Sequence, residues 1–135
     1  MSGERYPVLW IGQVSVVTLP AEIDVTNADA TREELLAVLN QGAAMLVADM
    51  SKTVFCDSSG VSALVRVFRH ATTGEAAIRL VVSTPAVQRV LSITGVDRLV
   101  DVYPSVAASL AGPKGQADPA WPDGATAKAD TDGSA

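Results

Sequence analysis

The sequence predicts a single α/β domain with a mixed β-sheet of about five strands and about four helices. The chain has 135 residues, a length that suits one domain. Short runs of aliphatic and β-branched residues alternate with segments whose apolar residues recur at helical spacing. Strands separated by helices are joined by right-handed crossovers, so most neighbouring strands are expected to be parallel.

The first two strands are expected to form an antiparallel hairpin. Residues 8–11 and 14–19 are rich in aliphatic and β-branched side chains, and only two residues separate them. Pro20 cannot donate to a β-ladder and ends the second strand.

Asn27 or Thr26 can cap the first helix, which is expected to run to about Asn40 before Gly42 stops it. The positions expected on its buried side are all aliphatic: Leu35, Leu36, Val38 and Leu39.

Two continuous apolar runs, residues 45–48 and 78–82, are typical of central strands covered on both faces. Between them, a helix is expected from Ser58 to about Thr72, ended by Gly74. The third helix is expected to begin near Pro85, because proline suits the first turn of a helix, and to break at Gly95. Residues 99–103 then form a last, edge strand, and Ser105 caps a final helix through Leu110.

Composition limits the core and the partners. Hydrophobic residues make up 48% of the chain and aromatic residues only 4%, so the core must be aliphatic. The net charge is −5 and the basic residues are scattered, whereas nucleic-acid binders carry a clustered basic face. No run of about 18 apolar residues is present. Together with the single cysteine, these features predict a cytoplasmic protein without nucleic-acid or membrane partners.

Composition changes near residue 112. Residues 112–135 contain no Val, Leu, Ile, Met or Phe and cannot bury enough apolar surface to offset chain entropy. We therefore expect one domain over residues 6–111 and a disordered tail over residues 112–135. Trp121 in that tail is either a small docking element or an aromatic residue without a role.

The four residues from Asp57 to Gly60 lie where a strand pattern stops and a helix pattern starts. Backbone N–H groups at a helix N-terminus are unpaired and favour negative charge, including phosphate. The hydroxyls of Ser58 and Ser59 can therefore serve as helix caps or as a regulated phosphate acceptor. The residues alone leave both alternatives open.

A second acidic segment, Glu22 to Asp24, is expected at the end of the second strand. If that strand lies beside the one leading into Asp57, both acidic loops open at the end of the sheet where α/β proteins bind ligands and partners. The alternative is that Glu22 and Asp24 only cap a helix and solvate a loop.

The sequence offers little for catalysis. His70 is the only histidine and lies about 18 Å along the helix from Ser58, at 1.5 Å per residue, too far to act as its base. Cys56 and His70 are too few to hold a metal, and no Gly-rich phosphate loop is present. Cys56 precedes Asp57, which disfavours a thiolate, so we expect a packing residue. We predict no catalytic residues, metal or cofactor, and hence no enzyme.

Four segments together resemble those of the anti-sigma-factor antagonists of bacteria, small single-domain members of the STAS family. The segments, in the family's order, are PAEID at residues 20–24, DMS at 49–51 with FCDSSGV at 55–61, STPAVQRVL at 83–91 with TGVD at 94–97, and VYPS at 102–105. The resemblance covers about residues 8–111 and implies a STAS-like fold with the element order β-β-α-β-α-β-α-β-α.

The resemblance also implies a function. Family members bind an anti-sigma factor when unphosphorylated and so release a sigma factor for transcription. The anti-sigma factor is a serine kinase that phosphorylates the serine after the aspartate, here Ser58, and a serine phosphatase reverses this step. The residues that this implies for the partner surface are Glu22, Asp24, Asp57, Ser58, Ser59 and Gly60. The alternative is a STAS interaction module in a scaffold or transporter-associated complex that is never phosphorylated. A hydrolase using Ser58 or Ser59 would lack a base.

Two positions depart from the family pattern. Ala21 stands where the family usually has glycine, and alanine would be strained there if the position needs a positive φ. Cys56 replaces the usual Ile, Leu or Met as a smaller core residue.

Overall fold

The structure is a computed structural model that describes residues 6–111. The predicted tail, including Trp121, lies outside these residues. The strands are β1 (Val8–Ile11), β2 (Val14–Thr18), β3 (Glu22–Ile23), β4 (Met45–Met50), β5 (Phe55–Cys56), β6 (Ala77–Val82) and β7 (Asp101–Tyr103). The helices are α1 (Ala28–Asn40), α2 (Ser58–Thr73), α3 (Pro85–Thr94), the 3-10 helix η1 (Val96–Arg98) and α4 (Val106–Leu110).

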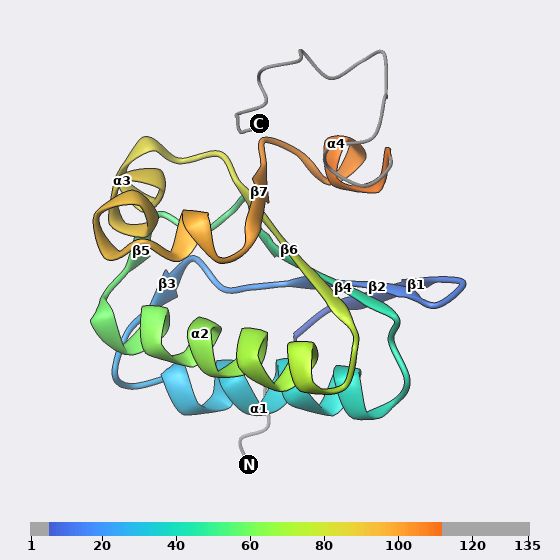
Figure 1. Cartoon of the computed structure of the whole chain (residues 1–135). Coiled ribbons are helices and arrows are strands. Elements are labelled where there is room, and N and C mark those ends of the chain that lie inside the picture. The colour runs from blue at the N-terminus through green and yellow to red at the C-terminus, as the bar shows by residue number, and fades with distance from the viewer. Residues whose placement is uncertain (1–5, 112–135) are drawn as a thin grey trace.

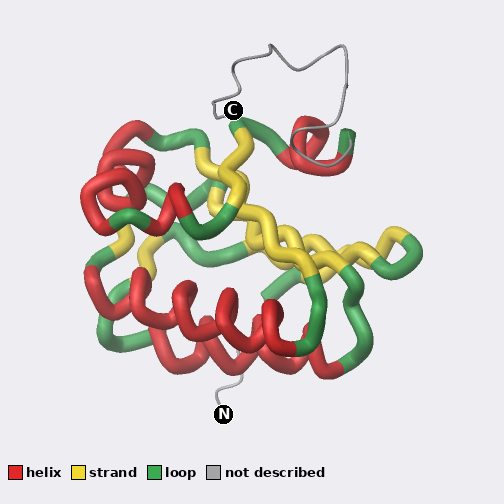
Figure 2. The backbone as a smooth tube through the Cα atoms, in the orientation of Figure 1, coloured by secondary structure: helices red, strands yellow, loops and turns green. Residues whose placement is uncertain are grey.

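Five strands form one mixed sheet in the order β1-β2-β4-β6-β7. Figure 2 shows the strands in yellow across the middle of the domain, with two long helices in red below them. The pair β1–β2 is antiparallel, and the pairs β2–β4, β4–β6 and β6–β7 are parallel. The predicted hairpin and the parallel crossovers are therefore confirmed. The two apolar runs form the central strands β4 and β6, as predicted, and β7 is an edge strand.

Helices α1 and α2 lie side by side against one face of the sheet (Figure 1). Their buried side chains and those of β2, β4 and β6 form the main core, which is aliphatic as expected. Among the predicted inward positions of α1, Leu35 and Val38 are fully buried, whereas Leu36 and Leu39 are partly buried. Gly95 ends α3 with a φ of +84°, a conformation in which glycine carries no side-chain penalty.

The opposite face of the sheet has a smaller cluster of Val16, Val47 and Val81, against which Val106 of α4 packs. Ser105 caps α4 by accepting a hydrogen bond from the Ala108 N–H at 3.1 Å, as predicted. The buried Arg79 donates from Nη1 to the Ser109 carbonyl, and its guanidinium lies 5.2 Å from the ring centre of Tyr103. Arg79 therefore ties α4 to the sheet.

Four predicted strand boundaries differ from the structure. Strand β4 extends two residues beyond the apolar run 45–48, to Met50, and β6 begins at Ala77, one residue before the run 78–82. The last strand begins at Asp101 and not at residue 99, because residues 96–98 form η1 and the Leu99 and Val100 N–H groups bond back to Val96. The second strand ends at Thr18, and Glu22–Ile23 forms the separate strand β3 beyond Pro20. This short strand pairs with β5 in a second, two-stranded sheet that the sequence did not predict.

Candidate functional site

Strand β5 leads directly into α2 through Asp57, which is the N-cap of this helix. Asp57 has extended backbone angles, and its Oδ1 accepts hydrogen bonds from the N–H groups of Ser59 at 2.8 Å and Gly60 at 3.2 Å. The Asp57 carbonyl accepts from Val61 N–H, which starts the helical ladder. Asp57 thus satisfies two of the unpaired amides at this end.

Ser58 is the first residue of α2, and its side chain is exposed. Ser59 is half-buried. Within residues 6–111 the structure records no hydrogen bond to either hydroxyl. The alternative in which Ser58 or Ser59 caps the helix with its side chain is therefore wrong, because the preceding aspartate does so. The Ser58 hydroxyl is left open to a reaction partner.

Strands β3 and β5 bring the second acidic segment to the same place. Glu22 pairs with Phe55 and Ile23 pairs with Cys56, in parallel register. The Asp57 N–H continues the ladder by donating to the Ile23 carbonyl at 3.1 Å. Asp24 follows Ile23 and Asp57 follows Cys56, and Ile23 and Cys56 are paired with each other. The expected convergence occurs, although β2 itself lies beside β4 and not beside the strand that leads into Asp57.

Asn27 and Asp24 hold the loop after β3. Asn27 Oδ1 accepts from the Asp24 N–H at 2.9 Å, and Asn27 Nδ2 donates to the Glu22 carbonyl at 2.8 Å. Asn27 occupies the N-cap position of α1, but its side chain bonds the loop and makes no cap bond. Sequence reasoning missed this role, although Asp and Asn two or three residues apart are typical of such side-chain-stabilised turns.

The Asp24 carboxylate stays charged at neutral pH. Its Oδ1 accepts hydrogen bonds from the hydroxyl of Thr26 at 2.5 Å and from the Thr26 N–H at 2.9 Å. These two bonds lower the pKa of Asp24 below its ordinary value, the hydroxyl bond contributing most. Glu22 is exposed on β3. Asp24 and Asp57 directly follow the paired residues Ile23 and Cys56, so the two acidic segments lie side by side along the backbone at the start of α2.

Gly60 is buried where α2 crosses β3 and β5. A Cβ atom at this position would lie 2.6 Å from Cys56 Sγ and 2.8 Å from Ile23 Cγ2. Only glycine lets the first turn of the helix approach these strands so closely. Gly60 therefore allows α2 to pack closely on β3 and β5. Its predicted contact with a partner stays a prediction.

Cys56 is a core residue, as expected. Its side chain is buried in the main core, and burial, followed by the neighbouring Asp57 carboxylate, raises the pKa of its thiol to about 11. A thiol with this pKa is protonated at neutral pH and is a poor nucleophile.

Ala21 fits its position without backbone strain. Among residues 6–111, Glu75 is the only non-glycine residue with a positive φ, so Ala21 does not need the conformation that favours glycine. The Ala21 carbonyl accepts from the N–H groups of Val54 at 2.8 Å and Phe55 at 3.3 Å. The departure from the family pattern therefore leaves the β3–β5 geometry intact.

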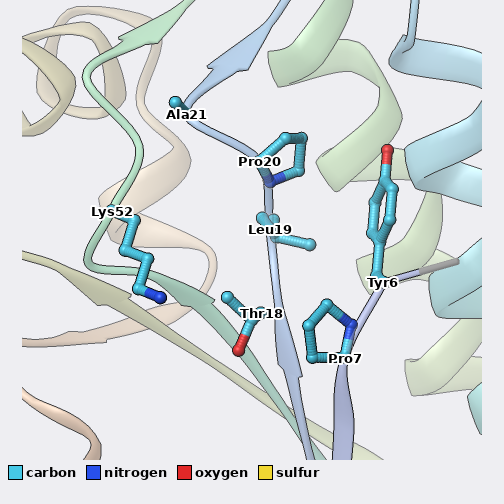
Figure 3. A pocket seen from close by; sticks show the side chains of 7 residues that line it. All are labelled: Tyr6, Pro7, Thr18, Leu19, Pro20, Ala21 and Lys52. Atoms are coloured by element: carbon cyan, nitrogen blue, oxygen red, sulfur yellow. The ribbon is translucent and has the colours of Figure 1, made fainter. Parts of the chain in front are cut away.

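A shallow hollow of about 290 Å³ lies beside the segment that connects β2 to β3 (Figure 3). Its lining residues are Tyr6, Pro7, Thr18, Leu19, Pro20, Ala21 and Lys52. The Tyr6 hydroxyl points away from the hollow and hydrogen-bonds to Thr31 Oγ1 at 2.8 Å. The walls are mostly apolar and present no pair of acid and base.

The described residues do not assemble a reactive centre around Ser58. His70 lies in the last turn of α2, at the far end from Ser58. Residues 6–111 hold no cluster of three or more His, Cys, Asp or Glu that could bind a metal ion. No helix within these residues is long and apolar enough to cross a membrane. The arrangement is a surface with an accessible hydroxyl beside carboxylates.

The chain belongs to the STAS domain family. The sequence model of the STAS domain matches residues 8–109, which contain every element from β1 to β7. No curated protein sequence matches the chain.

Solved structures of anti-sigma-factor antagonists are similar to the chain. An anti-sigma factor antagonist from Mycobacterium paratuberculosis is 30% identical, with a TM-score of 0.72 over 78% of this chain and 89% of that one. The Bacillus cell fate determinant SpoIIAA in its phosphorylated form is 19% identical, with a TM-score of 0.59 over 77% of this chain and 96% of that one. The second similarity supports the fold, which matches the predicted mixed sheet.

A membrane protein is also similar over part of its length. The murine anion transporter Solute Carrier 26 family member A9 is 25% identical, with a TM-score of 0.61. The match covers 72% of this chain but only 17% of the transporter.

Proposed function

We propose that the protein is an anti-sigma-factor antagonist that is switched off by phosphorylation of Ser58. The observation that carries the proposal is the exposed, unbonded Ser58 hydroxyl at the first position of α2, directly after the capping Asp57. Support comes from the antagonist of Mycobacterium paratuberculosis and from SpoIIAA, an antagonist with structures of an unphosphorylated and a phosphorylated form.

In the unphosphorylated state, the surface binds an anti-sigma factor with serine kinase activity. The contact surface consists of the start of α2 and the loop after β3, with Glu22, Asp24, Asp57 and Ser59 around the acceptor. Binding takes the anti-sigma factor away from its sigma factor, which then acts in transcription. The kinase brings its own ATP, so the protein itself performs no catalysis and takes no cofactor. A serine phosphatase restores the active form, and the whole exchange occurs in the cytoplasm.

Phosphorylation adds about −1.5 to −2 charges at pH 7 to a surface that already holds three carboxylates. The positive end of the α2 dipole stabilises part of this charge, so the domain need not unfold. Asp57 Oδ1 already occupies the amides of Ser59 and Gly60, so the phosphate finds few free donors and stays exposed. In a complex packed on Ser58, the phosphate adds bulk and an unpaired negative charge to the interface. Burying such a charge weakens the free energy of binding by a few kcal/mol.

The test uses Ser58→Ala and Ser58→Asp with the cognate anti-sigma factor. We expect Ser58→Ala to bind as the parent does and to resist labelling by the kinase. Ser58→Asp should fold normally, because an acidic residue suits the first turn of a helix, but should bind at least about tenfold more weakly. Calorimetry measures binding, and transfer of labelled phosphate measures the reaction.

Ser62 provides the matched control, because it is an exposed serine one turn further along the same helix. Ser62→Ala should be labelled as well as the parent. The proposal fails if the kinase still labels Ser58→Ala, or if Ser58→Asp binds as tightly as the parent while circular dichroism shows both variants folded.

The similarity to the anion transporter favours a second candidate, a STAS module that binds within a scaffold or transporter complex without phosphorylation. A pull-down from the host separates the two. An ATPase with serine kinase activity among the captured proteins supports the first candidate, and a membrane complex supports the second.

A further inference from the structure

Strand β1 is an apolar edge strand whose side chains remain partly open to solvent on both faces of the sheet. Val8, Leu9, Trp10 and Ile11 are 39%, 59%, 39% and 47% exposed. The other edge strand, β7, is short and contacts α4 and η1. Natural proteins protect open edges with charged residues, prolines or bulges. Among the described residues, Pro7 lies directly before β1, but the strand itself contains no charged residue and no proline and pairs with β2 without a bulge.

The hydrogen bonds of the hairpin show which groups face the open side. The Thr18 N–H donates to the Pro7 carbonyl at 2.9 Å. Bonded and non-bonded pairs alternate along an antiparallel ladder, so Leu9 and Ile11 bond to β2. Val8 and Trp10 then direct their N–H and C=O groups away from β2. The open edge thus offers two donors and two acceptors.

The hairpin of β1 and β2 contains no charged residue, and the nearest charged residues in the sequence are Arg5 before it and Glu22 after it. No Asp, Glu, Lys or Arg occurs in residues 6–21, although the chain carries a net charge of −5. Two copies of an acidic chain repel each other over most of their surfaces, but not here. The uncharged edge is therefore compatible with a second copy of the same chain, whereas a basic partner would find no complementary charge on it.

We propose that β1 pairs with β1 of a second copy and joins the two five-stranded sheets into one continuous sheet. An antiparallel, two-fold arrangement centred on Leu9 places Val8 opposite the partner's Trp10 and Leu9 opposite the partner's Leu9. This register uses all the outward groups of Val8 and Trp10 and forms four hydrogen bonds between the chains. The interface is isologous, as in most homodimers.

The proposed dimer leaves the acceptor surface free. The β1–β2 hairpin projects at one side of the molecule, whereas β3, β5 and the start of α2 lie at the other (Figure 1). The inference therefore does not depend on the proposed function. One four-residue strand from each copy is a small interface, so we expect a reversible, concentration-dependent dimer.

Sedimentation velocity of the full chain over about a hundredfold range of concentration tests the proposal. We expect a shift from monomer to dimer. Leu9→Lys places two ammonium groups opposite each other and should raise the dimer Kd at least about tenfold. Ile93→Lys is the matched control, because Ile93 is 76% exposed on α3 and gains the same charge. It should dimerise as the parent does, with circular dichroism confirming that both variants fold.

Leu9→Cys tests the register. Directly opposite residues of a non-bonded antiparallel pair have Cα atoms about 4.5 Å apart, within the range of a disulfide. Mild oxidation should therefore link Leu9→Cys into dimers, but neither Ile93→Cys nor the parent, whose Cys56 is buried. If the parent stays monomeric over this range of concentration, the proposal is wrong, and any strand that pairs with β1 comes from another protein. Dimers that Leu9→Lys does not weaken, or Leu9→Cys chains that do not link, overturn it as well.

Discussion

At the scale of single residues, Asp57 caps α2 and Ser58 offers a free hydroxyl, two roles that the sequence alone could not assign to one residue or the other. Both are residue types favoured at the N-cap, and the motif places them side by side. The structure gives the cap to Asp57, whose carboxylate bonds two amides, and leaves the Ser58 hydroxyl unbonded. The serine can therefore be modified without loss of the helix start. A switch residue that also capped the helix would couple signalling to unfolding.

This division predicts different stabilities for two alanine variants. Asp57→Ala removes the cap and should lower the free energy of unfolding by about 0.5–2 kcal/mol. Ser58→Ala removes no hydrogen bond and should change it by less than about 0.5 kcal/mol. Denaturant titration followed by circular dichroism measures both, and Asp57→Asn, which keeps a capping oxygen, is the control. If Ser58→Ala lowers the free energy of unfolding as much as Asp57→Ala or more, the serine side chain is the cap and this assignment is wrong.

The Cys56 thiol should make stability fall at high pH. Its pKa is about 11 in the folded protein against an ordinary value of 9.0, so the folded state holds the proton more tightly than the unfolded state. The stabilisation is complete below pH 9.0 and is lost as the pH rises from 9.0 to about 11. Comparing the parent with Cys56→Ala isolates this contribution from other groups that titrate there. Parallel pH profiles for the two proteins would show that the thiol is not protected by burial.

At the scale of secondary-structure elements, the long elements were predictable and the pair β3–β5 was not. The apolar runs that became β4 and β6 and the helical spacing of α2 are local signals that tertiary structure reinforced. Glu22–Ile23 and Phe55–Cys56 are two-residue strands, too short for any alternation to show. Their pairing joins positions 33 residues apart, since Glu22 is opposite Phe55. Only a three-dimensional arrangement supplies that information.

The packing of α2 on this pair predicts opposite effects for one substitution at the two ends of the helix. Gly60→Ala adds a methyl group within 2.6 Å of Cys56 Sγ and 2.8 Å of Ile23 Cγ2, and this overpacking should cost about 1–3 kcal/mol. Gly74→Ala meets only the His70 and Ala71 carbonyls, at 3.8 and 3.9 Å, with a φ of −88°. It should be neutral or stabilise by about 0.4–1 kcal/mol. Equal effects of the two substitutions in denaturant titration would contradict the close packing of α2 on the β3–β5 pair.

At the scale of the whole molecule, the sequence located the candidate site but not its construction. The segment from Glu22 to Asp24 and the start of α2 at Asp57 were expected to meet at one sheet edge, and their backbones do lie side by side. The structural basis is different from the expected one. After Pro20 the chain leaves the main sheet and forms β3 in the two-stranded sheet, and the side chain of Asn27 fixes the following loop. Backbone pairing and loop hydrogen bonds of this kind depend on geometry that residue types alone do not determine.

The domain boundary leads to the last prediction. Residues 112–135 contain no Val, Leu, Ile, Met or Phe, so deleting them should shift the Tm by less than about 2 °C. A chain that ends at residue 104 also loses α4, which uncovers Val47 and Val81 and removes the Ser109 carbonyl that Arg79 bonds. Exposing these side chains should lower the Tm by about 10 °C or more. Scanning calorimetry of the three chains measures both steps. If the first deletion costs as much as the second, residues 112–135 pack on the domain, and Trp121→Ala in the full chain should then reproduce the loss.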